Sequence, residues 1–221
     1  MKVKLFNKTD EMIDIIYTAA RTCYNAGSPI YMYKNINDID DSSKLRLIED
    51  CIKRNHLSVL EHAQFTFGIY GISRACSHQL VRHRHCSFSQ QSQRYVNLKD
   101  TTEFALPETI EDFAIINKTL EQIANCYEIL VEHGVKPEDA RAILPNACTT
   151  NLVMSCNLRE LIHICNERLC AKAQTEIREL VNAMKDEVIE RLPFLKPYLQ
   201  PKCVKLGKCT EFKSCGRIKS E

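Results

Sequence analysis

The densest group of side chains that could do chemistry lies between Arg82 and Tyr95. Two arginines and two histidines fill residues 82–85, and a stretch rich in serine and glutamine follows, with a further arginine at Arg94. Guanidinium groups bind phosphate oxygens in pairs, and serine and glutamine side chains can hydrogen-bond a base or a sugar. No acidic residue occurs from Arg82 to Lys99, whereas a plain surface mixes both signs of charge. The segment therefore favours a phosphate-bearing ligand over the alternative, a solvated basic helix end.

A second group lies on a predicted helix over residues 158–169. Arg159, His163 and Asn166 are spaced to share one face of this helix, while Arg168 lies half a turn away. If both arginines bind ligand, the helix serves two sites or two parts of one extended ligand. Taken singly, each arginine is better explained as a surface residue paired with a neighbour on the chain, Glu160 or Glu167.

Two further groups contain metal-ligand residue types. His56 and His62 are six residues apart, but an H-E-x-x-H spacing and a third evident ligand are missing, so a zinc hydrolase is not indicated. Near the C-terminus, five residues separate Cys203 from Cys209 and Cys209 from Cys215. With Cys170 as a fourth ligand these thiols could bind zinc or part of an iron–sulfur site. The alternative is a reduced cysteine-bearing tail without metal.

Composition limits the class of protein. The chain has 221 residues, a formal net charge of +2 and 44% hydrophobic residues. At this length we expect one domain, or one domain with a small appendage. The near-neutral charge is unlike that of a duplex-DNA binder, and no apolar stretch approaches the roughly 18 residues of a membrane helix. The N-terminus lacks the apolar core of a signal peptide, so we expect a cytoplasmic protein with reduced thiols.

The elements that must position these groups are helices and strands in mixed order. Phe65, Phe67 and Ile69 alternate with polar residues, which predicts a strand over residues 63–71. Further strands are predicted over 92–96 and 147–156. Residues 25–40 and the chain after Pro193 are predicted to be irregular, and residues 56–62 to form a turn or a helix start. Helical spacing predicts helices over residues 9–24, 45–56 (capped by Asp41-Ser42-Ser43), 72–83, 109–133, 137–144, 158–169 and 172–192. Strands and helices do not alternate regularly, so the predicted fold class is α+β, with mixed helices and a mainly antiparallel sheet.

No glycine-rich phosphate loop and no G-x-S-x-G elbow occurs in the sequence. If a nucleotide or a flavin binds, side chains must therefore hold it.

Several motifs resemble those of one enzyme family. The segment Arg82-His83-Arg84, seven residues and then Ser92, followed by Arg94-Tyr95, resembles the signature of the flavin-dependent thymidylate synthases. The H-x-[ST]-x-x-E-H element at residues 56–62, the A-R-x-x-L-P element at residues 140–145 and the segment 173–178 are also similar to family elements. So is the series Asn157, Arg159, His163 and Arg168. These motifs occur in the order and at the spacing of the family, and together they cover roughly residues 1–190.

The resemblance implies reductive methylation of dUMP to dTMP. The carbon would come from 5,10-methylenetetrahydrofolate and the reducing equivalents from NADPH through FAD. Members of the family are homotetramers whose active sites are shared between subunits. The resemblance places the synthase domain at residues 1–193 and leaves a cysteine- and lysine-rich tail at residues 194–221.

The resemblance also implies roles for individual residues. Arg168 and His56 would be catalytic, with Arg168 at the pyrimidine edge and His56 near the flavin and the folate. The residues expected to contact FAD are Ser58, Arg82, His83, Arg84, Gln90, Asn157, Arg159 and His163. The residues expected to contact dUMP are Gln79, Arg82, Gln90, Ser92, Arg94, Arg141 and Arg168. Gln90 stands where many relatives carry glutamate. Ser92 has no evident base, so we assign it to binding and not to nucleophilic attack.

A non-enzymatic nucleotide- or RNA-binding protein is the alternative function. It would use the arginine segment for phosphates and the cysteine tail as a metal module. Such a protein needs aromatic platforms for stacking, and only Phe88 and Tyr95 lie near the basic residues. We therefore expect no nucleic-acid partner. A catalytically dead relative is disfavoured because every mapped arginine is present.

Overall fold

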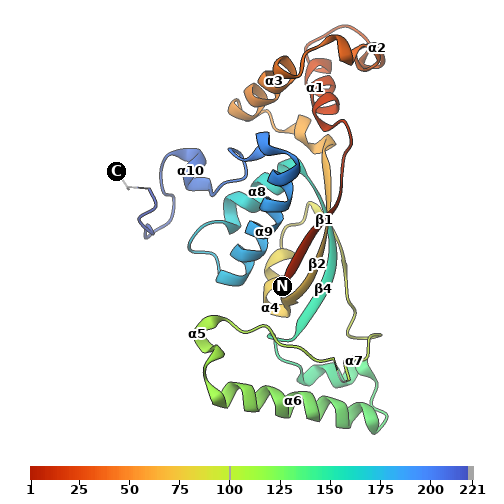
Figure 1. The fold of residues 1–221 in the computed structure, drawn as a ribbon, viewed down its shortest axis with the longest axis vertical. Helices are drawn as coiled ribbons and strands as arrows, with labels where there is room; N and C mark the ends of the chain where they lie inside the picture. Colours follow the sequence, from red (N-terminus) through yellow and green to blue (C-terminus); the bar gives the residue numbers. More distant parts are fainter. Residues whose placement is uncertain (100, 219–221) are drawn as a thin grey trace.

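A four-stranded sheet forms the centre of the molecule. The computed structural model describes residues 1–99 and 101–218, so residue 100 of the predicted synthase domain and residues 219–221 of the predicted tail lie outside the described residues. The strand order is β1 (Lys2–Lys8), β2 (Gln64–Ser73), β4 (Thr149–Asn157) and β3 (Cys86–Gln90), and all neighbours are antiparallel. Figure 1 shows this sheet with helices around it. The predicted α+β class with an antiparallel sheet is confirmed.

Strand alternation decides which face of the sheet is buried. Phe65, Phe67 and Ile69 of β2 point into the main core, as predicted, and Phe67 pairs with Met154 of β4. Helices α8 (Leu158–Arg168) and α9 (Thr175–Arg191) pack on this face of the sheet, and residues of other helices, such as Ile16 and Ile48, extend the same core. Both helices lie over the same face of the sheet (Figure 1). Burial of apolar surface between the sheet and these helices is thus the main stabilising contact of the fold.

Two glutamates of α9 fix its position against the strands. The Glu187 carboxylate accepts hydrogen bonds from Leu5 N and Lys4 Nζ of β1, at 2.9 and 3.1 Å. At the start of α9, Glu176 accepts from the backbone N and the hydroxyl of Ser73. The Ser73 hydroxyl oxygen in turn accepts from Cys76 N and so caps helix α4 (Arg74–Leu80). Helix α9 therefore sets the place where α4 begins.

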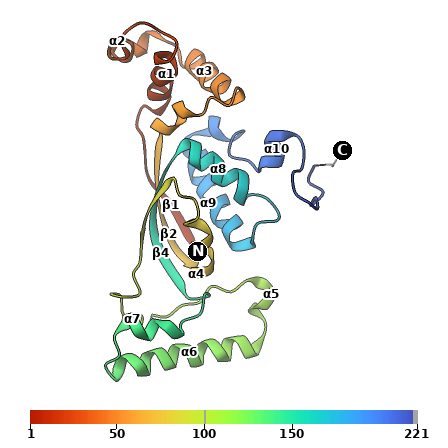
Figure 2. The same cartoon turned by 180° about the vertical axis from the view of Figure 1, so that it is seen from behind.

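The remaining helices lie beyond the two ends of the sheet. Helices α1 (Met12–Thr22), α2 (Pro29–Lys34) and α3 (Asp41–Lys53) form one end, and α5 (Glu108–Glu111), α6 (Ala114–Glu132) and α7 (Pro137–Ala140) form the other, as Figures 1 and 2 show. The second end has a small core of its own, made of Leu98, Tyr127, Ala140 and Cys148. None of the described helices combines the length and the apolar character that crossing a membrane requires.

Three predicted elements were wrong in part. Residues 25–40 contain α2 and the 3₁₀ helix η1 (Ile36–Asp38), because Ser28 accepts from Tyr31 N and Pro29 pre-sets the first helical turn. Residues 92–96 form no strand, and the edge strand is β3 instead, six residues earlier. The helix predicted over residues 109–133 is divided into α5 and α6 by a break at Asp112 and Phe113.

Element boundaries also differ from the prediction at several places. The N-cap of α3 is Asp40, one residue before the predicted group of caps. Ile72 and Ser73 complete β2 and do not belong to α4. After Pro193 the chain forms the 3₁₀ helix η4 (Pro193–Leu195) and helix α10 (Lys202–Leu206), and Leu195 and Leu199 are buried in the main core.

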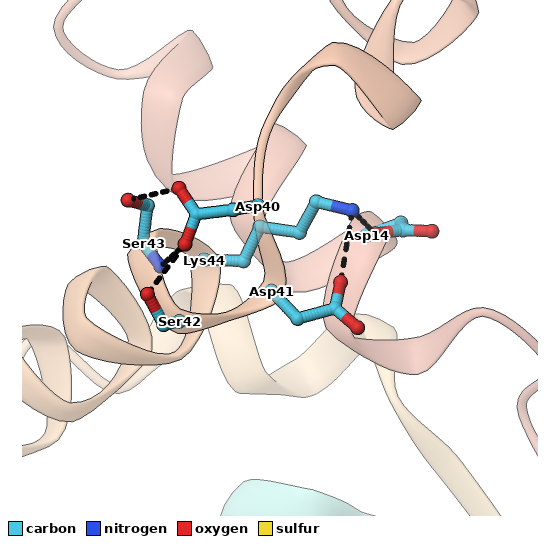
Figure 3. Close-up of polar contacts among 6 residues, drawn as sticks. All are labelled: Asp14, Asp40, Asp41, Ser42, Ser43 and Lys44. Carbon is cyan, nitrogen blue, oxygen red and sulfur yellow. Dashed lines mark hydrogen bonds and ion pairs between the residues drawn. The ribbon is translucent and has the colours of Figure 1, made fainter.

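A buried lysine joins α1 to α3. Lys44 is almost fully buried, and its ammonium lies 2.7 Å from Asp14 Oδ1 and 3.3 Å from Asp41 Oδ1 (Figure 3). The hydrogen bond to Asp14 raises the pKa of Lys44 despite the opposing effect of burial. In the same figure Asp40 accepts from Ser42 and Ser43, and these hydrogen bonds hold the pKa of Asp40 well below its usual range. The ammonium of Lys44 therefore stays charged and depends on Asp14.

The first prediction tests this contact through the free energy of unfolding. Asp14→Asn should lower it by about 2 kcal/mol, because a buried ammonium loses its nearer counter-ion. This is less than the 3–5 kcal/mol of a fully uncompensated charge, since Asp41 remains at 3.3 Å and the amide oxygen still accepts a hydrogen bond. Asp41→Asn is the matched control: Asp41 is 80% exposed, and we expect a change of at most about 0.5 kcal/mol. Urea unfolding curves measure both, and equal effects in the two variants would contradict the prediction.

Candidate functional site

A cleft of about 790 Å³ lies between helix α8, the turn after α4 and the C-terminal helix α10. This volume is within the range of about 300–1,000 Å³ of small-molecule sites. The residues that line it are Leu57, Glu61, Arg82, His83, Arg84, His85, Asn157, Arg159, Glu160, Ile162, His163, Asn166 and Lys205. Residues far apart in the sequence are thus brought to one cavity, and Arg159, His163 and Asn166 share the predicted face of α8.

Local structure explains how these side chains reach the cleft. Helix α4 ends at Leu80, and the turn at residues 81–85 leads into β3 and presents Arg82 and Arg84 to solvent. Asn157 ends β4 and caps α8, where its Oδ1 accepts from Glu160 N at 2.9 Å. The cleft therefore extends along α8 from its N-terminal cap to Asn166. At the N-terminal end the helix dipole favours an anion.

The charges in the cleft are mainly positive. Within residues 1–99 and 101–218, Arg82 and Arg84 have no ion-pair partner. Arg159 Nη1 lies 2.6 Å from Glu61 Oε1, and both side chains are partly exposed. An anionic ligand could therefore pair with Arg82 and Arg84 directly, whereas it must displace Glu61 to pair with Arg159.

Asn166 contributes an unsatisfied acceptor to the same cleft. In the part of the chain that the structure describes, its side-chain oxygen is buried without a hydrogen-bond partner. Such groups are rare in folded proteins because an unpaired buried acceptor costs free energy.

A histidine below the cleft joins α8 to the turn after α4. His83 is 6% exposed, and its Nε2 accepts a hydrogen bond from Arg168 Nε at 3.0 Å. A guanidinium can only donate, so the imidazole proton must be on Nδ1, which lies 3.3 Å from Glu160 Oε1. Burial, followed by the charges of Arg168 and His163, lowers the pKa of His83 to about 4. His83 is therefore neutral near pH 7 and holds Arg168 without cancelling its charge.

Three potential metal ligands meet at this point without forming a convincing metal site. Ligand atoms of His83, Glu160 and His163 lie within 4.8 Å of one another. However, the guanidinium of Arg168 is hydrogen-bonded to His83, and its positive charge opposes a second cation there. Arg168 also donates through Nη2 to Gln79 O at 3.2 Å, so it is fixed between two elements.

Two arginines predicted to bind dUMP lie elsewhere, at the edge of a second cleft. Arg94 Nη2 is 3.0 Å from Glu138 Oε2, and Arg141 Nε donates to the backbone oxygen of Glu138 at 3.1 Å. Arg141 lines this second cleft, of about 480 Å³, together with Arg74 and His78. One chain therefore carries the expected phosphate-binding arginines in two separate places.

The other predicted site residues do not line the first cleft. The Gln90 amide donates to Ser77 Oγ and Thr150 Oγ1, and the Gln79 amide donates to Gln174 Oε1. Ser92 Oγ accepts from Arg94 N at 3.2 Å.

His56 and Ser58 belong to the segment 56–62, of which Leu57 and Glu61 line the first cleft. Ser58 is exposed at the start of the 3₁₀ helix η2 (Ser58–His62). The His56 ring packs edge-on against Tyr24, at 6.0 Å between ring centres.

Sequence neighbours proved to be poor guides to ion-pair partners. Pairing of the α8 arginines with Glu160 or Glu167 was wrong, since Arg159 contacts Glu61 and Arg168 contacts His83. Lys205 was missed as a cleft residue. It lies in the segment predicted to be irregular, and no spacing signal in the sequence connects it to α8.

Comparison with known proteins gives consistent matches over nearly the whole chain. A family model described as thymidylate synthase complementing protein matches residues 4–194. A flavin-dependent thymidylate synthase of Pyrococcus horikoshii is 41% identical, over 96% of this chain and 90% of that protein. One of Nitratidesulfovibrio vulgaris is 37% identical, over 98% and 94%. A crystal structure of flavin dependent thymidylate synthase ThyX from Helicobacter pylori complexed with FAD and dUMP superposes with a TM-score of 0.71 at 28% identity, over 88% and 97% of the two chains.

The second prediction concerns the buried His83 and pH. Its folded pKa of about 4 lies below the usual value of about 6.5, so between these pH values the unfolded chain binds a proton that the folded chain does not. Stability must therefore fall as the pH drops from 6.5 towards 4. Between pH 7.5 and 4.5 the free energy of unfolding should fall by about 2 kcal/mol more for the unaltered chain than for His83→Gln.

The control for this experiment is the exposed histidine of α4. His78→Gln should keep the pH dependence of the unaltered chain, because this exposed side chain is not removed from water on folding. Urea unfolding of the protein without added ligands measures all three chains. A drop of the same size in His83→Gln would contradict the assignment of the buried neutral imidazole.

Proposed function

This chain belongs to the flavin-dependent thymidylate synthase family, and from this membership we propose that it converts dUMP to dTMP with FAD as its cofactor. The observation that carries the proposal is the convergence of six residues, expected from family motifs to contact flavin, on one cationic cleft. These residues are Arg82, His83, Arg84, Asn157, Arg159 and His163. The Helicobacter pylori relative of similar fold, crystallised with FAD and dUMP, supports the choice of ligands.

The cleft has the chemistry that FAD requires of a binding site. Arg82 and Arg84 offer unpaired guanidinium groups to a diphosphate, and Arg159 can add a third when it leaves Glu61. Bound FAD would supply the hydride chemistry that protein side chains lack. Ser58 and Gln90 are proposed as further contacts, and Gln90 must leave Ser77 and Thr150 to make one.

Arg168 is the residue that we propose to activate the pyrimidine. Its guanidinium is oriented by His83 and by the backbone oxygen of Gln79. A fixed positive charge at the pyrimidine edge stabilises negative charge at N3 as it develops, and no dipoles have to reorganise during the reaction. Arg94 and Arg141 are proposed to bind the phosphate of dUMP, with Gln79, Arg82, Gln90 and Ser92 as further substrate contacts.

We further propose 5,10-methylenetetrahydrofolate as the carbon donor and NADPH as the reductant. His56 is proposed to lie near the flavin and the folate. All twelve cysteines are free thiols, which supports a reducing cytoplasm as the location.

We propose a homotetramer with shared active sites because one chain separates the two sets of arginines. The cleft that contains Arg159 and the cleft that contains Arg141 are lined by different residues.

An exposed apolar surface also supports association of the subunits. On the face of the sheet opposite α9, Phe6, Tyr70 and Val153 are exposed, and the Phe6 ring packs across Gly68, where a side chain would overlap with it. Exposed apolar patches of this kind mark interfaces between proteins.

The third prediction tests the reaction and Arg168 together. With FAD, NADPH, dUMP and 5,10-methylenetetrahydrofolate at low oxygen, mass spectrometry should detect dTMP. Arg168→Ala should lower the rate by about 100-fold or more, since it removes charge placed where the transition state needs it. The matched control is Arg46→Ala on α3, whose guanidinium donates to Ser42 and Ser43 of its own helix and lines neither cleft. Its rate should stay within about twofold. Absence of dTMP, or equal losses in both variants, would contradict the proposal.

The fourth prediction tests whether subunits share a site. Arg82→Ala and Arg141→Ala should each be nearly inactive as pure proteins. After the two are unfolded together and refolded as a mixture, about a quarter of the sites should combine an intact Arg82 from one chain with an intact Arg141 from another. Activity should therefore reappear in the mixture, measured as dTMP formed per chain. A refolded mixture of unaltered chain with each variant is the control for refolding yield, and a mixture that stays inactive would show that both residues act within one chain.

A further inference from the structure

Four cysteines line one small cavity on the outer side of α8. Cys170 follows α8, Cys203 lies on α10, and Cys209 and Cys215 lie in the chain beyond it. The cavity measures about 50 Å³, which is room for a single ion or a water molecule and too little for an organic ligand. All four thiols are free, and none is fully buried. The two views of the fold show the chain after α10 turning beside α8 (Figures 1 and 2).

The segment that carries three of these cysteines lacks a hydrophobic core. From Lys202 to Ile218 no side chain is buried, and Val204, Leu206 and Phe212 are exposed. The segment is nevertheless folded back on α8, where Arg217 Nη1 donates to Leu169 O at 3.3 Å. Short segments that cannot bury apolar surface are held in other proteins by disulfides or by metal ions. Disulfides are absent among the described residues, which leaves the thiols themselves as ligands.

We propose that Cys170, Cys203, Cys209 and Cys215 bind one zinc ion that fixes residues 202–218 to α8. Four thiolates are the ligand set of a closed, tetrahedral structural zinc site. The cavity has room for one ion. Three cations, Lys172, Lys202 and Arg217, and two acids, Glu167 and Glu211, line the same cavity. Their balance is positive and partly offsets the negative charge of four thiolates around a divalent ion.

Zinc binding has to draw the thiols together. Among the described residues, no three of these sulfurs already lie within 4.8 Å of one another. The chain that must move is exposed, and Gly207 and Gly216 adopt left-handed conformations that allow tight turns near two of the cysteines. Binding releases the thiol protons and forms four Zn–S bonds, with no change of oxidation state.

This site also affects the first cleft. Lys205 of α10 lines that cleft, and α10 lies within the segment that the zinc ion would hold. The zinc ion would therefore hold Lys205 at the first cleft, although the ion itself lies in a different cavity.

The fifth prediction is the metal content of the full chain. Purified under reducing, anaerobic conditions and supplied with zinc, the chain should retain about one zinc ion per chain after gel filtration, measured by mass spectrometry of the elements. Cys209→Ser and Cys215→Ser should each lower the zinc content about tenfold or more. Cys126→Ser, an exposed cysteine on α6 outside the cavity, should leave it unchanged. Cobalt in place of zinc should give the absorption bands of tetrahedral thiolate coordination.

A second readout keeps the test independent of folding yield and of the proposed reaction. Removal of zinc by a chelator should expose residues 202–218 to limited proteolysis and leave the main core resistant, because the core is formed without this segment. Less than a tenth of a zinc ion per chain in the unaltered protein would overturn the site. Iron retained in place of zinc, or zinc retained by the cysteine variants, would overturn it equally. None of these measurements involves FAD or dUMP.

Discussion

The hydrogen bond from Arg168 to His83 is the interaction on which the rest of the site depends. It links α8 to the turn after α4, and these two elements carry most of the residues of the first cleft. Because His83 is buried, it stays neutral and accepts from the guanidinium without forming an ion pair. A carboxylate in the same place would hold Arg168 equally well but would cancel its charge. Glu160 is one step removed, on the other side of the imidazole.

The fold explains why that hydrogen bond can form. Glu176 of α9 holds Ser73, and Ser73 caps α4, so the start of α4 is tied to the helix that covers the sheet. Seven residues later α4 ends, and His83 follows within one turn. Helix α8 begins directly at the end of β4, where Asn157 caps it. The positions of α4 and α8 are therefore both fixed relative to the central strands. The close packing of the main core keeps the residues that line the cleft in place.

Local patterns in the sequence predicted most helices and strands, whereas the ion-pair partners of the arginines depend on the tertiary fold. Alternation along Phe65, Phe67 and Ile69 identified β2 because one face of this strand is fully buried. Strand β3 escaped detection because it is an edge strand of serine, glutamine and few apolar residues, with a weak pattern. The pairing of Arg159 failed for another reason: its partner, Glu61, is 98 residues away, and no short-range rule identifies such a contact.

The arginines fall into two kinds that differ in how the ligand-free chain holds them. Arg159 and Arg94 are paired with Glu61 and Glu138, and in both pairs the two side chains are partly exposed to water. Exposed ion pairs contribute at most about 1 kcal/mol, so a phosphate can replace the glutamate at little cost. In the proposed reaction these glutamates thus keep the guanidinium groups extended until a ligand arrives. Arg168 needs no such exchange, because its neutral partner remains in place while the charge acts on the substrate.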